Sequence, residues 1–143
     1  MFRALNDRVL ASPQITLDDV AAAAAQGVGL IVNNRPEGES DDQTPGEAIE
    51  AAARAAGLDY VSIPVTHAGF SEGQVKAMAA ALASTDKPVL AYCRSGTRST
   101  LLWALAEASR GKSPHALSAA AAQVGYDVSP VRALMDMLSA NAG

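Results

Sequence analysis

Short apolar runs alternate with longer amphipathic segments along this chain. The apolar runs have the length of buried strands and cover residues 9–11, 28–32, 60–63 and 89–92. Segments with helical spacing separate them, at residues 17–26, 46–56, 71–84 and 99–110. Two more helices are predicted to begin at Ser113-Pro114 and Ser129-Pro130, because proline suits the first helical position. Strands separated by helix-length crossovers predict an α/β fold, a mostly parallel central sheet flanked by helices.

Length and composition restrict the class of protein. The 143 residues suit a single domain spanning 1–143, and the net charge of -4 argues against a basic surface for nucleic acid. Two His and one Cys make neither a structural zinc site nor an internal disulfide, so we expect no metal and no cofactor. The N-terminal stretch lacks the apolar run of a signal peptide, and the alanine-rich runs are too short to span a bilayer. We therefore expect a cytoplasmic protein without membrane association.

The segment with the clearest chemistry follows the predicted strand 89–92. Ligands of parallel sheets bind beyond the carboxyl ends of the strands, and Cys93 lies at such an end, before a helix. Backbone N–H groups of a glycine-containing loop and a helix N-terminus together bind anions. We interpret Cys93 as a nucleophile and Arg98 as a bidentate ligand of an oxyanion. The remaining candidates for this anion-binding loop are Arg94, Ser95, Gly96, Thr97 and Ser99, and the hydroxyls of Thr97 and Ser99 are candidate donors to the thiolate.

Three other features allow two interpretations each. Arg35, in Asn33-Asn34-Arg35-Pro36, either extends the positive pocket at the same sheet edge or belongs to an ordinary turn. His67 is either a proton donor or an ordinary loop residue. The acidic run from Glu37 to Asp42 is expected to be a solvated loop, with a mobile acid as the alternative.

The chain also resembles known families. The run Cys93 to Arg98 is similar to the active-site loop of rhodanese-type sulfurtransferases, Cys-Arg-x-Gly-x-Arg. The chain as a whole resembles the phosphatase-like domains named for a beta-lactamase-hydrolase-like protein. The residues that carry this second resemblance are Leu5-Asn6-Asp7, Ser12-Pro13-Gln14-Ile15, Asn33-Asn34-Arg35-Pro36, Ile63-Pro64-Val65 and Cys93 to Ser99. It implies the fold of dual-specificity tyrosine phosphatases, with Cys93 as nucleophile and Arg98 as oxyanion ligand. Some bacterial domains of this type are fused to persulfide dioxygenases, which implies a partner in sulfur metabolism.

Two details favour sulfur transfer over phosphate hydrolysis. The phosphatase signature places five residues between cysteine and arginine, whereas four separate Cys93 from Arg98 here, and a tighter cradle suits a persulfide sulfur. The loop from Pro64 to Glu72 has no Asp to serve as general acid, which leaves His67 or Glu72.

We therefore expect a cysteine-dependent sulfurtransferase. It would move sulfur from a small anionic donor, thiosulfate or glutathione persulfide, through a Cys93 persulfide to an external thiol acceptor. The alternative is a tyrosine or dual-specificity type of phosphatase acting through a Cys93 phosphocysteine. A third interpretation is a non-catalytic module that binds anions or senses redox state.

Overall fold

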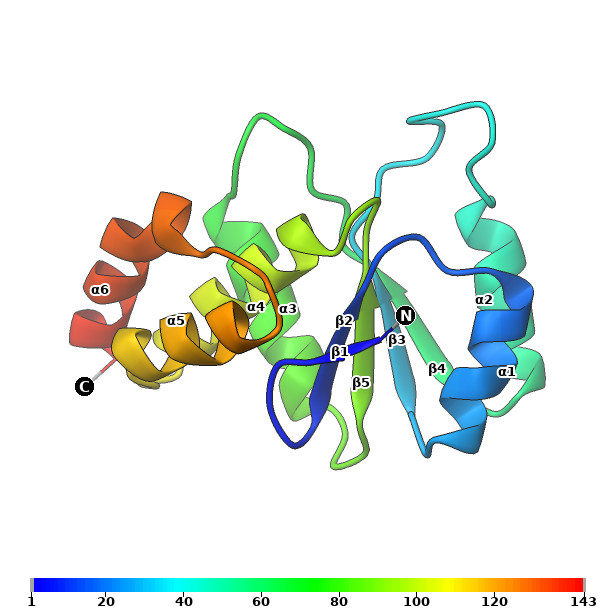
Figure 1. Cartoon of the computed structure of the whole chain (residues 1–143), viewed down its shortest axis with the longest axis horizontal. Coiled ribbons are helices and arrows are strands. Elements are labelled where there is room, and N and C mark those ends of the chain that lie inside the picture. The colour runs from blue at the N-terminus through cyan, green and yellow to red at the C-terminus, as the bar shows by residue number, and fades with distance from the viewer. Residues whose placement is uncertain (1, 143) are drawn as a thin grey trace.

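A five-stranded sheet forms the centre of the computed structural model, which describes residues 2–142 (Figure 1). Its strand order is β1-β2-β5-β3-β4. Strand β1 pairs antiparallel with β2, and the other neighbours are parallel. The sheet is thus mostly parallel, as predicted. The strands are β1 (Arg3–Ala4), β2 (Val9–Ser12), β3 (Leu30–Asn33), β4 (Asp59–Ser62) and β5 (Val89–Tyr92).

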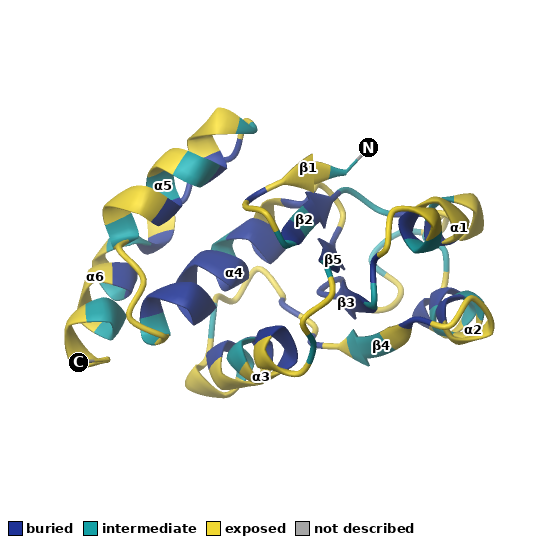
Figure 2. Ribbon diagram, turned by 90° about the horizontal axis from the view of Figure 1, so that it is seen from below, coloured by how far each residue is buried: buried dark blue, intermediate teal, exposed yellow. Residues whose placement is uncertain are grey.

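Helices cover both faces of this sheet (Figures 1 and 2). One face packs against α1 (Leu17–Ala25) and α2 (Gly46–Ala55), and the other against α3 (Glu72–Ala83) and α4 (Thr97–Ser109). Alternate side chains of β5 enter the two cores, because successive residues of a strand point to opposite faces. Burial on both faces explains why the central strands are continuous apolar runs.

The C-terminal part of the chain packs on α4 rather than on the sheet. It comprises α5 (Pro114–Gln123), the 3-10 turn η1 (Ser129–Val131) and α6 (Arg132–Asn141). Ten of the 13 residues of α4 are buried between this layer and the sheet (Figure 2). No helix within residues 2–142 combines the length and the apolarity that crossing a membrane requires.

The ends of the observed elements lie within two residues of the predicted ones, and three further differences concern the elements themselves. Strand β1 is only two residues long and carries no periodic signal. Ser129-Pro130 opens the 3-10 turn η1, and the last helix begins after it, at Arg132. Helix α4 begins at Thr97 rather than Ser99, directly after Gly96, whose φ of 92° is in the left-handed region that glycine tolerates. This earlier start places Arg98 in the first turn of α4.

Candidate active site

The cysteine loop (residues 93–96) connects β5 to α4 at the carboxyl edge of the sheet. Cys93 is fully buried, and its backbone N–H donates to the Ser12 carbonyl at 3.3 Å. The Gly96 N–H donates to Cys93 Sγ at 3.1 Å. A backbone N–H thus lies within hydrogen-bond distance of the sulfur, the candidate nucleophile.

Two carbonyls of the cysteine loop are held on its outer side. The Arg94 carbonyl accepts from the Gln14 N–H at 3.2 Å, and the Ser95 carbonyl accepts from the Tyr126 hydroxyl at 3.0 Å. In a trans peptide the C=O and the following N–H point in opposite directions. The N–H groups of Ser95 and Gly96 therefore point away from these two partners, and the Gly96 N–H reaches the Cys93 sulfur. Successive backbone N–H groups of this kind are candidates for binding an anion.

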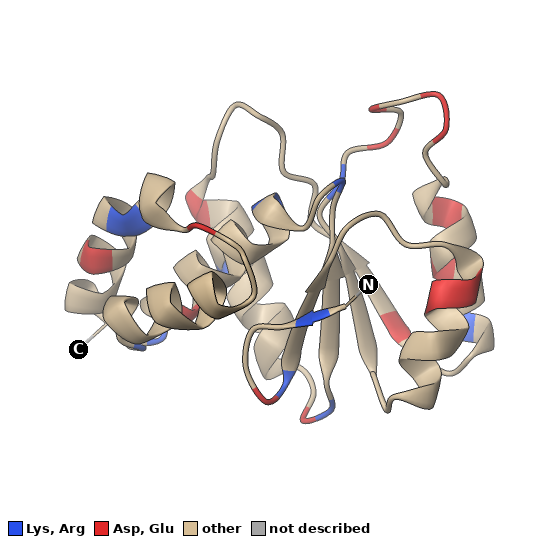
Figure 3. Ribbon diagram, in the orientation of Figure 1, with Lys and Arg blue, Asp and Glu red and all other residues tan. Residues whose placement is uncertain are grey.

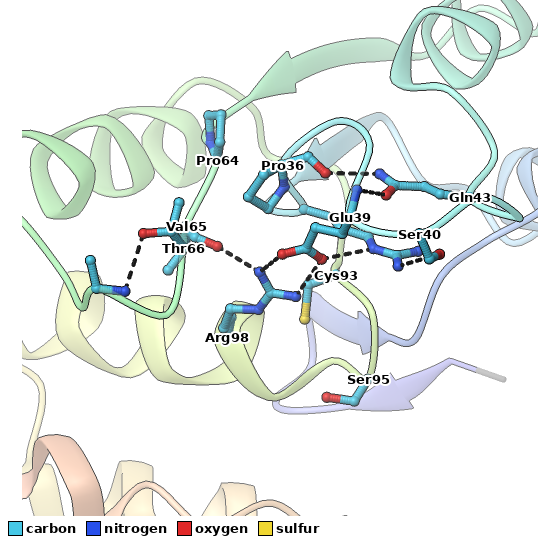
Figure 4. Close-up of polar contacts among 12 residues, drawn as sticks. Pro36, Glu39, Ser40, Gln43, Pro64, Val65, Thr66, Cys93, Ser95 and Arg98 are labelled. Atoms are coloured by element: carbon cyan, nitrogen blue, oxygen red, sulfur yellow. Dashed lines mark hydrogen bonds and ion pairs between the residues drawn. The ribbon is translucent and has the colours of Figure 1, made fainter.

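Arg98 lies beside the sulfur with one edge of its guanidinium already bound (Figure 4). Its Nη1 donates to the Val65 carbonyl and to Glu39 Oε2, each at 2.7 Å, and its Nη2 donates to Glu39 Oε1 at 2.9 Å. These bonds use three of the five guanidinium N–H donors. The other two, on Nε and Nη2, share one edge and carry no hydrogen bond to an oxygen or nitrogen within residues 2–142. Contact with the Cys93 sulfur is among the causes that raise the pKa of Arg98, after the hydrogen bond to Glu39. That edge has the fork geometry that binds two oxygens of an anion.

Glu39 links this arginine to a second one. Arg35 Nε donates to Glu39 Oε1 at 2.9 Å, so one carboxylate joins the guanidiniums of Arg98 and Arg35. The hydrogen bonds from Arg98 are the main reason that the pKa of Glu39 falls to about 2; those from Arg35 add to the effect and burial opposes it. The same contact raises the pKa of Arg98. Glu39 is therefore ionised at neutral pH.

The expectation of a solvated loop is wrong for Glu39, whose side chain is only 18% exposed. Most of the acidic positions of this loop do face solvent beside basic positions at the carboxyl edge of the sheet (Figure 3). Glu39 differs because it reaches back to Arg98, which is 59 residues away in the sequence. The local sequence signal is the spacing of four residues between Arg35 and Glu39, which is typical of ion pairs on helices rather than in loops.

Arg35 is buried rather than part of an exposed turn. Besides Glu39, its guanidinium donates to Gln14 Oε1 at 3.0 Å and to Ser40 Oγ at 3.1 Å. Strand β3 lies next to β5 with Asn33 opposite Tyr92, which brings Arg35 to the same sheet edge as Cys93, as the sequence indicated. The carboxylate of Glu39 lies between Arg35 and Arg98.

The hydroxyls of the loop are arranged differently from our prediction. The Ser99 hydroxyl donates to Asn34 Oδ1 at 2.8 Å, so the prediction that it donates to the thiolate is wrong. Asn34 binds the Ile63 carbonyl through its Nδ2, which shows that this buried pair joins α4 to the neighbouring strands. Thr97 is exposed, and its Oγ1 accepts from Ser95 Oγ at 3.0 Å. Arg94 is also exposed, at the mouth of the loop.

Of the two predicted acid candidates, Glu72 is the first residue of α3, and His67 lies on the connection between β4 and α3. His67 is exposed there, two residues after Val65, whose carbonyl binds Arg98. Glu72 is exposed in the first turn of α3 and pairs with Lys76 at 2.9 Å. The hydrogen bond from Lys76 lowers the pKa of Glu72, which makes this residue a poor proton donor.

Comparison with known proteins identifies the family. The family model described as "Beta-lactamase hydrolase-like protein, phosphatase-like domain" matches residues 1–110. The chain belongs to this family. It is 39% identical over 108 residues to the beta-lactamase hydrolase-like protein of Xylella fastidiosa, which covers 76% of this chain and 25% of the relative. It is 36% identical over 108 residues, with the same coverage, to the beta-lactamase hydrolase-like protein of Agrobacterium fabrum. The chain thus spans about a quarter of the length of these curated relatives.

Solved structures of similar fold are described as phosphatases. A candidate phosphatase from Neisseria meningitidis Z2491 superposes with a TM-score of 0.81 at 29% identity, covering 94% of this chain and 96% of its own. A second candidate phosphatase, from Shewanella putrefaciens CN-32, gives 0.78 at 25% identity, with 99% and 93% covered. Tk-PTP in its active form gives 0.74 at 17% identity, with 97% and 96% covered, and shares the fold. The predicted cysteine-phosphatase-like fold is confirmed.

These findings correct the expectation of a sulfurtransferase. The family and the structural relatives support a phosphatase-like enzyme, which was the alternative. The length of the cysteine loop does not by itself decide between the two chemistries, because the helix that follows also positions Arg98. With α4 starting at Thr97, Arg98 lies in its first turn, and the guanidinium still lies beside Cys93 although only four residues separate the two (Figure 4).

Proposed function

We propose that this domain hydrolyses phosphoric monoesters, of the tyrosine or dual-specificity type, through a covalent phosphocysteine at Cys93. The Nε and Nη2 edge of Arg98, which binds no oxygen of the described residues and lies beside the buried sulfur, carries the proposal. Together with the Ser95 N–H of the cysteine loop, it binds the non-bridging oxygens of a phosphoryl group, while the Gly96 N–H stays on the Cys93 sulfur. Membership in a phosphatase-like family supports this assignment.

The reaction takes two displacements at phosphorus. The Cys93 thiolate attacks phosphorus, an S–P bond forms, and the P–O bond to the leaving group breaks with its electron pair on oxygen. The leaving oxygen takes its proton from water or from His67, the candidate donor on the loop between β4 and α3. Water then attacks the phosphocysteine, the S–P bond breaks, and inorganic phosphate and a proton leave while the thiolate re-forms.

Arg98 acts in both displacements, because charge on the equatorial oxygens persists through both. Glu39 and the Val65 carbonyl hold the opposite side of the guanidinium, so Arg98 does not have to be ordered when substrate arrives. Arg35 holds Glu39 in turn and adds positive charge at the same edge. Arg94, exposed at the mouth, is placed to contact an anionic group beside the phosphate.

The test is hydrolysis of an aryl phosphate by the protein and by its Cys93→Ser variant. We expect turnover by the protein, loss of turnover in the variant, and an acid-quenched intermediate carrying one phosphoryl group on Cys93 by mass spectrometry. Turnover that survives Cys93→Ser would contradict the covalent mechanism. Vanadate binding without any hydrolysis would favour the non-catalytic anion-binding module.

A further inference from the structure

We propose that Tyr126 is a positioning residue of the cysteine loop: its hydroxyl holds the peptide between Ser95 and Gly96 in the orientation that directs the Gly96 N–H at the Cys93 sulfur. The inference rests on the proposed function in treating Cys93 as the nucleophile. It concerns a residue outside the part of the chain, 1–110, that the family model matches.

Both ends of this one peptide are hydrogen-bonded. The Tyr126 hydroxyl donates to the Ser95 carbonyl at 3.0 Å on the outside of the loop. The Gly96 N–H donates to Cys93 Sγ at 3.1 Å on the inside. Because the two groups belong to one planar unit and point in opposite directions, holding the carbonyl also aims the N–H.

Without the tyrosine hydroxyl, the bond from the Gly96 N–H to Cys93 Sγ is the one hydrogen bond that still holds this peptide within the described residues. Gly96 has a φ of 92°, and glycine tolerates both signs of φ, so the peptide before it can turn over at low cost. Rotation would direct the Ser95 carbonyl oxygen at the thiolate or at a bound phosphate, where like charges repel. The neighbouring peptides are held by backbone groups: the Arg94 carbonyl accepts from the Gln14 N–H, and the Gly96 carbonyl accepts from the Thr100 N–H at 3.0 Å.

Tyr126 is itself fixed against the loop. Its side chain is buried, and its ring is so close to Gly96 that a Cβ added to that glycine would lie 2.9 Å from Tyr126 Cζ. On its other side the guanidinium of Arg3 lies 5.0 Å from the ring centroid, and Arg3 also donates to the Val124 carbonyl at 3.0 Å. The hydroxyl is thus aimed by packing as well as by its hydrogen bond.

The test is the Tyr126→Phe variant, which keeps the ring and removes the hydroxyl. Alkylation of Cys93 by iodoacetamide reports the thiolate fraction together with the access of the reagent to this buried sulfur. The ratio of the rate at neutral pH to the rate at strongly alkaline pH cancels the access and isolates the thiolate fraction at neutral pH. If the Gly96 N–H no longer points at the sulfur, the thiolate loses one hydrogen bond. A hydrogen bond to a charged group stabilises it enough that we expect the variant to react about tenfold more slowly at neutral pH. At strongly alkaline pH the rates of variant and wild type should converge, because the thiol is then ionised in both. Arg98 and Glu39, the charged side chains beside the sulfur, are unchanged in the variant.

Tyr60→Phe is the matched control. Tyr60 also has a hydroxyl in a hydrogen bond, accepting from Asn33 Nδ2 at 2.9 Å, but it belongs to β4, at the far edge of the sheet. Its alkylation profile should match that of the wild type. A lower melting temperature in Tyr126→Phe with an unchanged alkylation profile would assign Tyr126 a purely structural role and overturn the proposal.

A second variant covers the case in which Tyr126→Phe does not fold. Arg3→Gln keeps the hydroxyl and removes the cation from the other side of the ring, and we expect a smaller decrease of the alkylation rate at neutral pH. An alkylation rate equal to that of the wild type would overturn the proposal. The alkylation assay needs no substrate, so a wild-type protein that hydrolyses no phosphate would contradict the proposed function and leave this result standing.

Discussion

Two loops leave neighbouring parallel strands at the carboxyl edge of the sheet, and they are built in opposite ways. The cysteine loop after β5 is short and begins with a buried residue, and its carbonyls are bound from three different segments. The acidic loop after β3 (residues 34–45) is long and mixes exposed with partly buried positions, and side chains hold it together. Gln43 bridges the Pro36 carbonyl and the Glu39 N–H, and Glu37 accepts from the Gly46 N–H.

The two loops also contribute differently to the site. The cysteine loop provides backbone amides, whose direction is set by covalent geometry and hydrogen bonds. The acidic loop provides a charge, the Glu39 carboxylate, which orients Arg98 from outside. Geometry set by the backbone persists through changes of pH, whereas an orientation set by an ion pair depends on ionisation. The direction of the amides in the cysteine loop should therefore not change with pH, whereas the orientation of Arg98 depends on the ionisation of Glu39.

The largest expected effect on activity comes from removing the paired Nε and Nη2 donors of Arg98. Arg98→Lys keeps the charge but loses the paired Nε and Nη2 donors, and we expect kcat/KM for an aryl phosphate to fall about 10²–10³-fold. Arg110→Lys is the matched control, since Arg110 follows the other end of the same helix and pairs with Glu107 at 2.9 Å. Equal activity of both variants would show that a point charge is enough at position 98.

A smaller loss of activity is expected from removing the negative charge of Glu39 in the acidic loop. Glu39→Gln keeps the shape of the side chain and weakens its hold on both arginines, so we expect kcat/KM to fall about tenfold. Asp41→Asn, an exposed carboxylate in the same loop, should leave it unchanged. An increase of kcat/KM in Glu39→Gln would show that the carboxylate competes with substrate for Arg98 instead of orienting it.

The smallest effect is on stability and depends on pH. The pKa of Glu39 is lowered from 4.5 to about 2 in the folded protein, so its ionised form stabilises the fold above pH 4.5, and this contribution is lost as pH falls toward about 2. The difference in free energy of unfolding between wild type and Glu39→Gln should shrink across that interval, as measured by urea denaturation. The contributions of the other carboxyl groups are common to both proteins and cancel in this difference of free energies. A difference that stays constant would show that the ion pair adds nothing to stability.

Most of the fold could be predicted because its signals are local. Continuous apolar runs bounded by glycine and proline identified the four parallel strands, and caps such as Thr16 and Ser71 marked helix starts. The start of α4 was missed because its cap is Gly96, in the left-handed region, with no side-chain hydrogen bond to announce it. The two-residue strand β1 depends on pairing with β2, which no periodicity reports.

The candidate site was predictable only where its residues are contiguous. Cys93 to Ser99 could be read as one segment, and the parallel sheet brought Arg35 to the same edge. Glu39 could not be assigned, because an acidic loop residue is usually solvated and its partner is 59 residues away. Tyr126 was missed for the same reason, since its contact with Ser95 spans 31 residues. The sulfurtransferase prediction failed because spacing was judged without the helix that carries Arg98.

The burial of α4 has a consequence for how the site comes apart. Helix ends near binding loops often fray, and their amides then exchange with deuterium through small local openings. Here the first turn of α4 carries Arg98 and is continuous with a helix packed between the sheet and the C-terminal layer, with Trp103 and Leu105 fully enclosed. Opening that turn disturbs the core, so the amides of α4 should be among the slowest to exchange. The cysteine loop with Arg98 and the hydrophobic core should then unfold as one cooperative unit.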